Sequence, residues 1–316
     1  MGQTIPLYRR AFLIYNPLAG KLRRNPALLS EVMRVLASQG HAVTPSPTQK
    51  AGHAMSLSRE CLSEGADLIL AAGGDGTINE VANGMVGSHV PLAILPAGTA
   101  NVLATETRLG GNAIRVAHQL DQLKPARIAL GLLAEPDGTP RRHFLAMAGA
   151  GLDAHIVVNL NPRTKELLGK GAYWLASFRS TTRRLQELHA SSEGSTIRCS
   201  LALASRVRNY GGDLVIAAGA SILKEHLELV LFEGENPLRY LKYLFGVATG
   251  KLYGMTGITV IKTRSLTLQA AGSPVHVQLD GEDCGTLPAR VELIPDALTL
   301  LLPPEFLERE RRRWTT

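Results

Sequence analysis

The chain has 316 residues and a mass of 33.9 kDa, a size that exceeds one ordinary domain and favours two. Hydrophobic residues make up 45% and charged residues 19%, so both parts can bury a core and wholesale disorder is excluded. The formal net charge of +7 favours anionic partners such as nucleotide phosphates or lipid headgroups.

The cysteines and the apolar runs indicate in which cellular compartment the protein is found. The cysteines Cys61, Cys199 and Cys284 lie far apart and form no C-x-x-C, so we expect neither a disulfide framework nor a structural zinc site. No apolar run reaches the roughly 18 residues of a transmembrane helix, and no signal-peptide pattern opens the chain. These features predict a cytoplasmic protein.

Residues 1–129 alternate short apolar runs with stretches of helical spacing, which predict buried strands and amphipathic helices. The strands are expected at Ala11–Tyr15, Leu68–Ala72 and Leu92–Leu95, and the helices at Leu28–Ser38, Ile78–Met85 and Ala100–Thr107. Continuous apolar strands separated by helices are typical of a parallel sheet that is covered on both faces. The first domain is therefore predicted to be α/β.

Residues 130–304 have short runs of Val, Ile, Leu and Thr with Gly, Pro, Asn and Asp between them. This pattern predicts an antiparallel β-sandwich domain, interrupted by helical stretches at Arg163–His189 and Pro237–Leu252. Residues 305–316 are predicted to be a basic tail. The strands are expected at Arg127–Leu133, His143–Ala148, Ile197–Ala204, Leu214–Ala217, Leu227–Phe232, Gly257–Val260, Ser265–Gln269, Val275–Leu279 and Arg290–Ile294.

The most informative string is Ala71–Glu80, AAGGDGTINE, which ends one predicted strand and begins one predicted helix. Its glycines let the backbone approach a ligand, and amides at a helix start can bind phosphate oxygens. Because bare phosphate would repel Asp75, its useful role is to hold Mg²⁺, directly or through water. Thr77 can cap the helix or bind phosphate, and Glu80 stands at capping-box spacing from it. No G-K-[ST] follows, so this is not a Walker A loop.

Two similar loops follow the other predicted strands of the first domain. Asn16–Lys21, NPLAGK, comes after the first strand, and Pro96–Asn101, PAGTAN, comes after the third. In a parallel sheet all three loops lie at one edge, which is where open α/β sheets bind nucleotides. The sequence therefore predicts a nucleotide site at this edge.

These strings resemble the diacylglycerol kinase catalytic-domain family, which includes bacterial lipid kinases and the related sphingosine and ceramide kinases. The resemblance continues through GAGLDA at 149–154, NYGGD at 209–213 and LDGE at 279–282, in the family's order. GGDGT alone is shared with NAD kinases and partly with phosphofructokinases, whereas LDGE favours lipid kinases. The match spans nearly the whole chain.

The resemblance implies ATP- and Mg²⁺-dependent phosphorylation of a lipid, with ATP in a cleft between an α/β domain and a β-rich lipid domain. Thr48 enters the implied site from the resemblance, with little support from its own surroundings. The implied ATP-binding residues are Asn16, Pro17, Leu18, Ala19, Gly20, Thr48, Gly73, Gly74, Asp75, Gly76, Thr77, Ile78, Asn79, Glu80 and Thr99.

The acid–base candidates are Asp280 and Glu282. They follow Val275–Leu279, which alternates like a strand, and Gly281 between them permits a turn. In phosphoryl transfer a carboxylate orients the attacking hydroxyl and accepts its proton. The family resemblance supports the pair, and the sequence does not rank one above the other.

One position departs from the family pattern. Bacterial members carry an Asp here that helps to bind a second, structural Mg²⁺, whereas this chain has Lys224 between Ser221 and His226. A lysine repels Mg²⁺ but its ammonium can occupy the same negative surroundings. We therefore expect this metal site to be lost, unless Glu225 takes over after a one-residue slip.

A lipid kinase must also reach a bilayer. Basic residues beside aromatic ones suit adsorption to anionic lipid, with a solvated helix face and a frayed tail as the alternative. Tyr240, Tyr243, Leu244 and Phe245 are expected to be core rather than an acyl-chain pocket. The basic and aromatic candidates are Arg163, Lys165, Lys170, Tyr173, Trp174, Phe178, Arg179, Arg183 and Arg184, with Arg309, Arg311, Arg312, Arg313 and Trp314 in the tail.

The sequence thus predicts a lipid kinase of phospholipid metabolism, peripheral to the inner face of the membrane. Its acceptor is diacylglycerol-like or sphingoid, and no nucleic-acid-binding motif is present. Two alternatives stay open: a soluble-nucleotide kinase like NAD kinase, and a nucleotide-binding regulator without lipid kinase activity. A homodimer is also left open.

Overall fold

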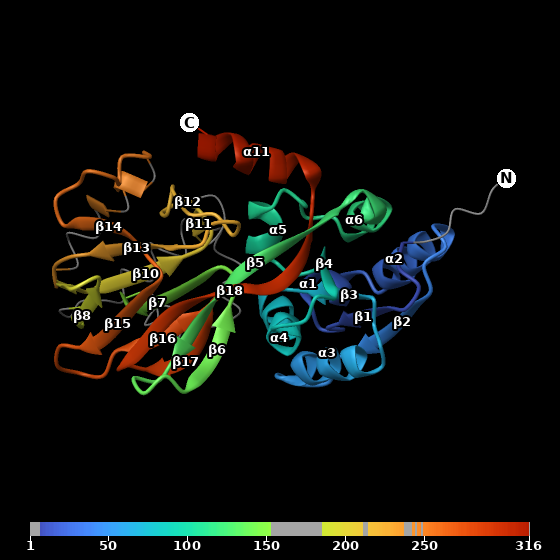
Figure 1. The fold of residues 1–316 in the computed structure, drawn as a ribbon, viewed down its shortest axis with the longest axis horizontal. Helices are drawn as coiled ribbons and strands as arrows, with labels where there is room; N and C mark the ends of the chain where they lie inside the picture. Colours follow the sequence, from blue (N-terminus) through green and yellow to red (C-terminus); the bar gives the residue numbers. More distant parts are fainter. Residues whose placement is uncertain are drawn as a thin grey trace. The chain divides into compact units, whose positions relative to one another are not determined.

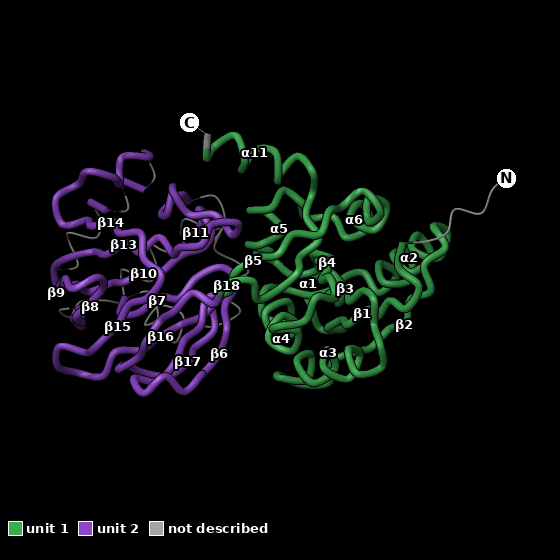
Figure 2. Tube along the Cα trace, in the orientation of Figure 1, with its two compact units in different colours: residues 1–130, 295–316 green, residues 131–294 purple. Residues whose placement is uncertain are grey.

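The computed structural model describes residues 7–152, 185–210, 214–236, 242–243, 245–247 and 249–315. The chain forms two compact units, residues 1–130 with 295–316 and residues 131–294 (Figure 2). It passes from one unit to the other within β5 (Lys124–Ala134) and again within β18 (Ala289–Leu302). The second unit thus ends ten residues before the predicted boundary at 304, because the last part of β18 pairs with a strand of the first unit.

The first unit is built on a parallel sheet in the order β2-β1-β3-β4, followed by the end of β18 (Figure 1). Its strands are β2 (Val43–Pro47), β1 (Ala11–Tyr15), β3 (Leu68–Gly73) and β4 (Pro91–Pro96). β3 is buried along its whole length, since strands lie on both sides of it and helices cover the sheet. The predicted α/β domain is confirmed.

Helices cover both faces of this sheet, with α3 and α4 packed together on one face and α2 and α6 on the other (Figure 1). The α3–α4 contact needs Gly84, since a Cβ there would lie 2.5 Å from the Met55 carbonyl oxygen. The helices are α1 (Gly20–Arg24), α2 (Ala27–Ser38), α3 (His53–Ser63), α4 (Asp75–Met85), α5 (Val102–Glu106), α6 (Ala113–His118) and α11 (Pro304–Thr315), with a short 3₁₀ turn at Leu120–Gln122.

The second unit is an antiparallel β-sandwich, as predicted. One sheet has the order β14-β13-β10-β7-β16-β17, with all neighbours antiparallel. Its central strands are buried at every residue because both of their faces are covered. These strands are β14 (Ile258–Thr263), β13 (Leu227–Phe232), β10 (Leu201–Ser205), β7 (Met147–Gly151), β16 (His276–Leu279) and β17 (Glu282–Thr286).

The other antiparallel strands of this unit follow the order β9-β8-β15-β18, and β5 pairs with β6. Their bounds are β9 (Ser195–Cys199), β8 (Leu188–Ser192), β15 (Ser265–Ala270) and β6 (Pro140–Phe144). A two-stranded ribbon joins β11 (Asn209–Tyr210) to β12 (Leu214–Val215).

Several predicted elements of the second unit differ in extent. The run His143–Ala148 is two strands, β6 and β7, because the chain turns at Leu145 and Ala146. The predicted helix Arg163–His189 lies mostly outside the described residues, and its last two residues belong to β8. Among the described residues, no helix is long and apolar enough to cross a membrane.

Candidate active site

The predicted glycine loops meet at one edge of the first unit's sheet. β1, β3 and β4 are adjacent and parallel, so the loops that follow them leave from the same side. The strand order changes direction between β1 and β3, because the chain moves from β1 to β2 on one side and then to β3 on the other. Open α/β sheets bind ligands at such a switch point.

The loop after β3 and the loop after β4 touch backbone to backbone. The N–H groups of Ala97 and Gly98 both donate to the Gly73 carbonyl at 3.0 Å. A Cβ on Gly98 would lie only 2.4 Å from the Cα of Gly74. Glycine at position 98 is therefore required by this close approach.

The loop after β1 reaches the same place. A Cβ on Gly20 would lie 3.3 Å from the Thr99 hydroxyl oxygen, and Lys21 donates its backbone N–H to the Ala97 carbonyl at 2.9 Å. The Asn16 side chain accepts the Leu18 N–H at 2.9 Å and shapes the loop as an Asx turn. All three predicted loops are thus brought together.

Thr48 lies at this edge too. It follows β2, whose last residue pairs with Tyr15, and its N–H donates to the Tyr15 carbonyl at 2.8 Å. Asn16 is the next residue after Tyr15, and its own N–H donates to the Ala72 carbonyl at 3.0 Å. Thr48 therefore lies beside the loop after β1, although its sequence surroundings carry little signal.

Asp75 links two of the loops. It is the first residue of α4, and its Oδ1 accepts the N–H of Val102, the first residue of α5, at 2.8 Å. The carboxylate thus stabilises the positive N-terminal end of both helices. A half-buried carboxylate between two glycine loops can also hold a metal that arrives with phosphates.

The predicted capping box of Thr77 and Glu80 is wrong. α4 begins two residues before Thr77, with Gly74 as its N-cap in an extended conformation. The Glu80 carboxylate instead accepts the N–H groups of Gly52 at 2.7 Å and Ala54 at 3.1 Å. Glu80 therefore caps the start of α3, which holds the segment after Thr48 in place.

The remaining residues that were predicted to bind the nucleotide differ in how exposed they are to solvent. Ile78 and Asn79 are each 1% exposed and belong to the core of the unit, so their side chains are not presented to a ligand. Leu18 is 76% exposed and Ala19 is buried. Half-buried Gly74, Gly76 and Thr77 lie in the first turn of α4 or just before it.

Lys21 is a cation at this edge that the sequence analysis left out of the site. Its ammonium group donates to the Gly111 carbonyl. Burial, and then the charge of Arg24, lower the pKa of this lysine. The Gly-Lys pair that closes NPLAGK is the signal that identifies it, since lysine is a common phosphate ligand.

In the second unit, Asp280 serves a structural role. Its carboxylate accepts three backbone N–H groups, from Leu145, Ala146 and Met147, each at 2.9 Å. Its own N–H donates to the Met147 carbonyl, and its φ of 49° places it in the left-handed region. Asp280 therefore holds the turn between β6 and β7 against the end of β16.

Glu282 has different surroundings at the same turn. Its Oε2 accepts from Arg142 Nη1 at 2.6 Å, and its side chain is 43% exposed. Gly281 between the two acids has a φ of 87° and donates its N–H to the Gln278 side chain. Glu282 is thus held by an ion pair with Arg142, and its side chain is accessible from solvent.

Other predicted motifs are only partly described. Residues 153–154 of GAGLDA, residues 211–213 of NYGGD and the basic stretch Arg163–Arg184 lie outside the described residues. Tyr243 is 2% exposed and donates to the Glu233 carbonyl, as expected for a core residue, whereas Phe245 is 69% exposed. Tyr240 and Leu244 lie outside the described residues.

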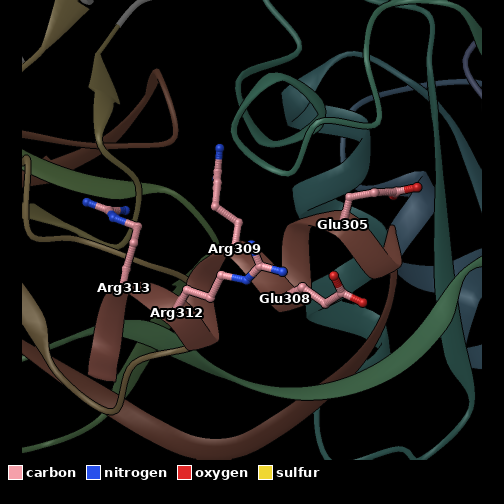
Figure 3. Close-up of a pocket in the computed structure, with 5 residues that line it drawn as sticks. All are labelled: Glu305, Glu308, Arg309, Arg312 and Arg313. Carbon is pink, nitrogen blue, oxygen red and sulfur yellow. The ribbon is translucent and has the colours of Figure 1, made fainter. Parts of the chain in front are cut away.

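The basic tail is an ordered helix, α11, rather than a frayed end. Phe306 and Glu310 are buried on one face, and Arg309 stacks over the Phe306 ring at 5.2 Å. The described residues that line a pocket on this helix are all charged (Figure 3). They are Glu305, Glu308, Arg309, Arg312 and Arg313.

Residues 10–133 match the model of the diacylglycerol kinase catalytic domain. Residues 146–302 match the YegS C-terminal NAD kinase beta sandwich-like domain. The chain belongs to the diacylglycerol kinase catalytic-domain family. The two matches correspond to the parallel-sheet unit and the β-sandwich unit.

Family relatives align over nearly the full length of this chain. A diacylglycerol kinase of Bacillus subtilis (strain 168) is 25% identical over 311 residues, which cover 95% of this chain and 99% of the relative. The diacylglycerol kinase of Staphylococcus haemolyticus (strain JCSC1435) is 24% identical, with 95% and 90% covered.

Solved structures share the fold. The crystal structure of a diacylglycerol kinase from Bacillus anthracis str. Sterne matches with a TM-score of 0.76 at 21% identity, covering 95% of this chain and 99% of the other. An NAD kinase from Archaeoglobus fulgidus, solved in complex with ATP, matches with a TM-score of 0.52 at 12% identity, covering 95% and 96%. The fold is therefore common to lipid and NAD kinases.

Proposed function

We propose that this chain is an ATP-dependent lipid kinase, which transfers the γ-phosphoryl group of ATP to a lipid hydroxyl. The observation that carries the proposal is the meeting of three glycine loops at the switch point of the parallel sheet, with Gly98 against Gly74. Membership of the diacylglycerol kinase family supports the reaction class. The acceptor is diacylglycerol-like or sphingoid.

The first unit binds ATP in this proposal. The first-turn amides of α4, which begins at Asp75, receive phosphate oxygens, because N–H groups at a helix N-terminus have no partner within the helix. Gly74 and Gly76 let the phosphates approach the backbone. Lys21 adds a positive charge beside the same loops.

Mg²⁺ is implied by the family, and the donor set fits an ion that arrives with the nucleotide. In the part of the chain that the structure describes, no group of three or more His, Cys, Asp or Glu side chains could hold a metal by itself. Asp75 is a single carboxylate with one oxygen already bonded to Val102, so phosphate oxygens would supply further ligands. When bound, Mg²⁺ neutralises phosphate charge during transfer.

In the second unit, Glu282 acts as the base in this proposal. Its exposed carboxylate orients the acceptor hydroxyl and accepts its proton as the oxygen attacks the γ-phosphorus. Arg142 keeps the carboxylate in one position. Asp280 holds the turn that carries Glu282, because both of its oxygens already accept backbone N–H groups.

The exposed end of α11 supports a peripheral position on an anionic membrane surface. Arg311, Arg312 and Arg313 are exposed, and Trp314 is 46% exposed. Basic residues near an anionic surface contribute roughly 1 kcal/mol each, and tryptophan favours the interface. Arg309, by contrast, packs on Phe306 and pairs with Glu310.

The test is an acceptor panel with ATP labelled on its γ-phosphate. Diacylglycerol, monoacylglycerol, phosphatidylglycerol and sphingosine are offered in vesicles, and NAD is offered in solution. We expect labelled product from a lipid and none from NAD. Label in NAD would establish the soluble-nucleotide kinase instead, and ATP binding without transfer to any acceptor would establish a regulator.

A further inference from the structure

The loop from Ala217 to His226, which leads into β13, has a cation of its own in Lys224. Lys224 Nζ donates to the Gly219 carbonyl at 2.9 Å, within the same loop. The Lys224 backbone N–H donates to the Ser221 carbonyl at 3.1 Å. Family resemblance implies an acid at position 224 and a structural Mg²⁺ coordinated in this loop. The hydrogen bonds and ion pairs of this loop show whether Mg²⁺ could be coordinated there.

Three carbonyl groups of the loop, those of Gly219, Ile222 and Lys224, already accept bonds from cationic side chains. Arg206, which is fully buried, donates to the Ile222 carbonyl and, at 3.4 Å, to the Lys224 carbonyl. Lys224 occupies the Gly219 carbonyl in the same way. A metal ion bound to these three carbonyl groups would have to displace both positive groups.

Of the nearby acids, Glu225 is paired on the surface, and Glu228 is buried with an Oε2 that has no hydrogen-bond partner among the described residues. Glu225, the alternative after a one-residue slip, pairs with Arg264 at 2.5 Å, and both side chains are 70% exposed. Glu228 is 3% exposed and accepts the Tyr253 hydroxyl at 2.9 Å. A Cβ on Gly219 would lie 2.8 Å from a Glu228 carboxylate oxygen, and the Gly219 carbonyl accepts from Lys224 Nζ, so both charged groups lie close to Gly219.

Positively charged side chains surround His226 at the end of this loop. Burial lowers the pKa of His226, and the neighbouring charges of Lys224, Lys262, Arg206 and Arg264 lower it further. Burial raises the pKa of Glu228, while bonds from Tyr253 and Gly219 and the charges of Lys224 and Lys262 oppose that rise. These positive charges would repel an added divalent cation, and the charge of Lys224 already acts on the buried carboxylate of Glu228.

We propose that the Lys224 ammonium group is the built-in cation of the 217–226 loop, so that the β-sandwich unit keeps its structure without a divalent metal. The ammonium group donates to the Gly219 carbonyl, and its positive charge offsets the negative charge of Glu228. A bound metal ion would play the same two roles. This inference is independent of the lipid kinase activity, because it concerns the nucleotide-free chain.

The experiment is thermal unfolding of the full chain without nucleotide or lipid, in Mg²⁺ and in EDTA. We expect the wild-type protein to have the same Tm in both buffers. Lys224→Met should lower Tm by about 4 °C or more in both buffers, because a loop cation is lost beside a buried acid. Lys251→Met, which removes an exposed lysine of the same unit, is the matched control and should leave Tm unchanged.

Two outcomes would overturn the proposal. One is a wild-type Tm that falls on EDTA treatment and recovers with Mg²⁺, which would show that a metal stabilises the fold. The other is a Lys224→Met protein whose Tm equals that of Lys251→Met. The wild-type comparison stands even if Lys224→Met does not fold.

Discussion

Arg142 Nη1 donates to Glu282 Oε2 at 2.6 Å, from β6 to the first residue of β17. Two residues before Glu282, the Asp280 carboxylate accepts three backbone N–H groups instead. An acid with backbone donors on both oxygens is committed to the turn, whereas an exposed acid that is paired with an arginine can also contact a bound substrate. This contrast separates two carboxylates that the sequence left unranked.

Glu282→Gln should lower kcat roughly 10²–10⁴-fold, because the amide cannot accept the hydroxyl proton. The Tm should stay within about 1–2 °C of wild type, because the side chain is 43% exposed. Steady-state kinetics on the best lipid acceptor measures the loss. Asp283→Asn, on the same strand with 46% exposure, is the control and should keep full activity. Unchanged kcat in Glu282→Gln would remove this residue from the chemistry.

Asp280→Asn should lower the stability of the fold, and this loss should be its main effect. Asparagine tolerates the left-handed backbone at this position and keeps one oxygen acceptor, but its amide nitrogen cannot accept the Leu145 N–H. We expect a loss of about 1–3 kcal/mol in the free energy of unfolding, measured by urea titration. If stability is unchanged while kcat collapses, Asp280 is the base and the ranking is reversed.

The Gly98–Gly74 contact gives a matched pair of variants. Gly98→Ala places a methyl group 2.4 Å from backbone, and we expect a loss of about 2–3 kcal/mol in stability. Gly74→Ala has its nearest contact at 3.5 Å, so stability should stay within about 1 kcal/mol. In the proposed ATP site this methyl group would block the approach of phosphate to the backbone, so ATP affinity should fall tenfold or more, about 1.4 kcal/mol. Equal ATP affinity in Gly74→Ala and wild type would contradict phosphate binding at this turn.

His143 predicts a pH dependence. Burial lowers the pKa of its imidazole from the ordinary 6.5, so the unfolded chain takes up this proton before the folded one does. The stabilising contribution is complete above 6.5 and is lost as the pH falls through the lower folded value. His143→Gln should therefore lose less stability than wild type between about pH 7.5 and pH 5 in urea titrations. His189→Gln is the control, and equal losses in wild type and His143→Gln would contradict the assignment.

The exposed arginines of α11 are expected to bind anionic lipid. Replacing Arg311 and Arg312 by Gln should weaken binding to phosphatidylglycerol vesicles roughly thirtyfold at low salt, at about 1 kcal/mol per charge. High salt should remove most of the difference because it screens the charges. Exposed Arg59 and Arg115, replaced together, control for net charge. Equal weakening by both pairs would mean that α11 is not a specific contact surface.

The parallel sheet could be predicted because β1, β3 and β4 are buried and therefore apolar throughout. Strand β2 could not be predicted from the sequence, because it is an edge strand with the sequence VTPSP and is only partly buried. An edge strand needs no apolar run and tolerates proline. α3 was also missed, because few of its residues are buried and its capping acid, Glu80, lies on another helix.

The part of the candidate site that could be predicted from the sequence is the part in which the backbone geometry requires glycine. Gly98 is needed where two of the loops meet, Gly73 is needed where the backbone passes Thr77, and both glycines are visible in the chain. The roles of Glu80 and Asp280 depend on partners 26 and 133 or more residues away, so no local pattern reports them. The α11 helix was hidden for a similar reason, since its buried Phe306 and Glu310 are few among many charges.

The most direct measurement is a single-turnover reaction with γ-labelled ATP and lipid vesicles, comparing wild type with Glu282→Gln. Wild-type protein should move the label from ATP into the lipid product, and Glu282→Gln should bind ATP equally well but transfer the label at least about 10²-fold more slowly. ATP bound by the wild-type protein with no label reaching any lipid, or equal transfer rates for the two proteins, would contradict the account.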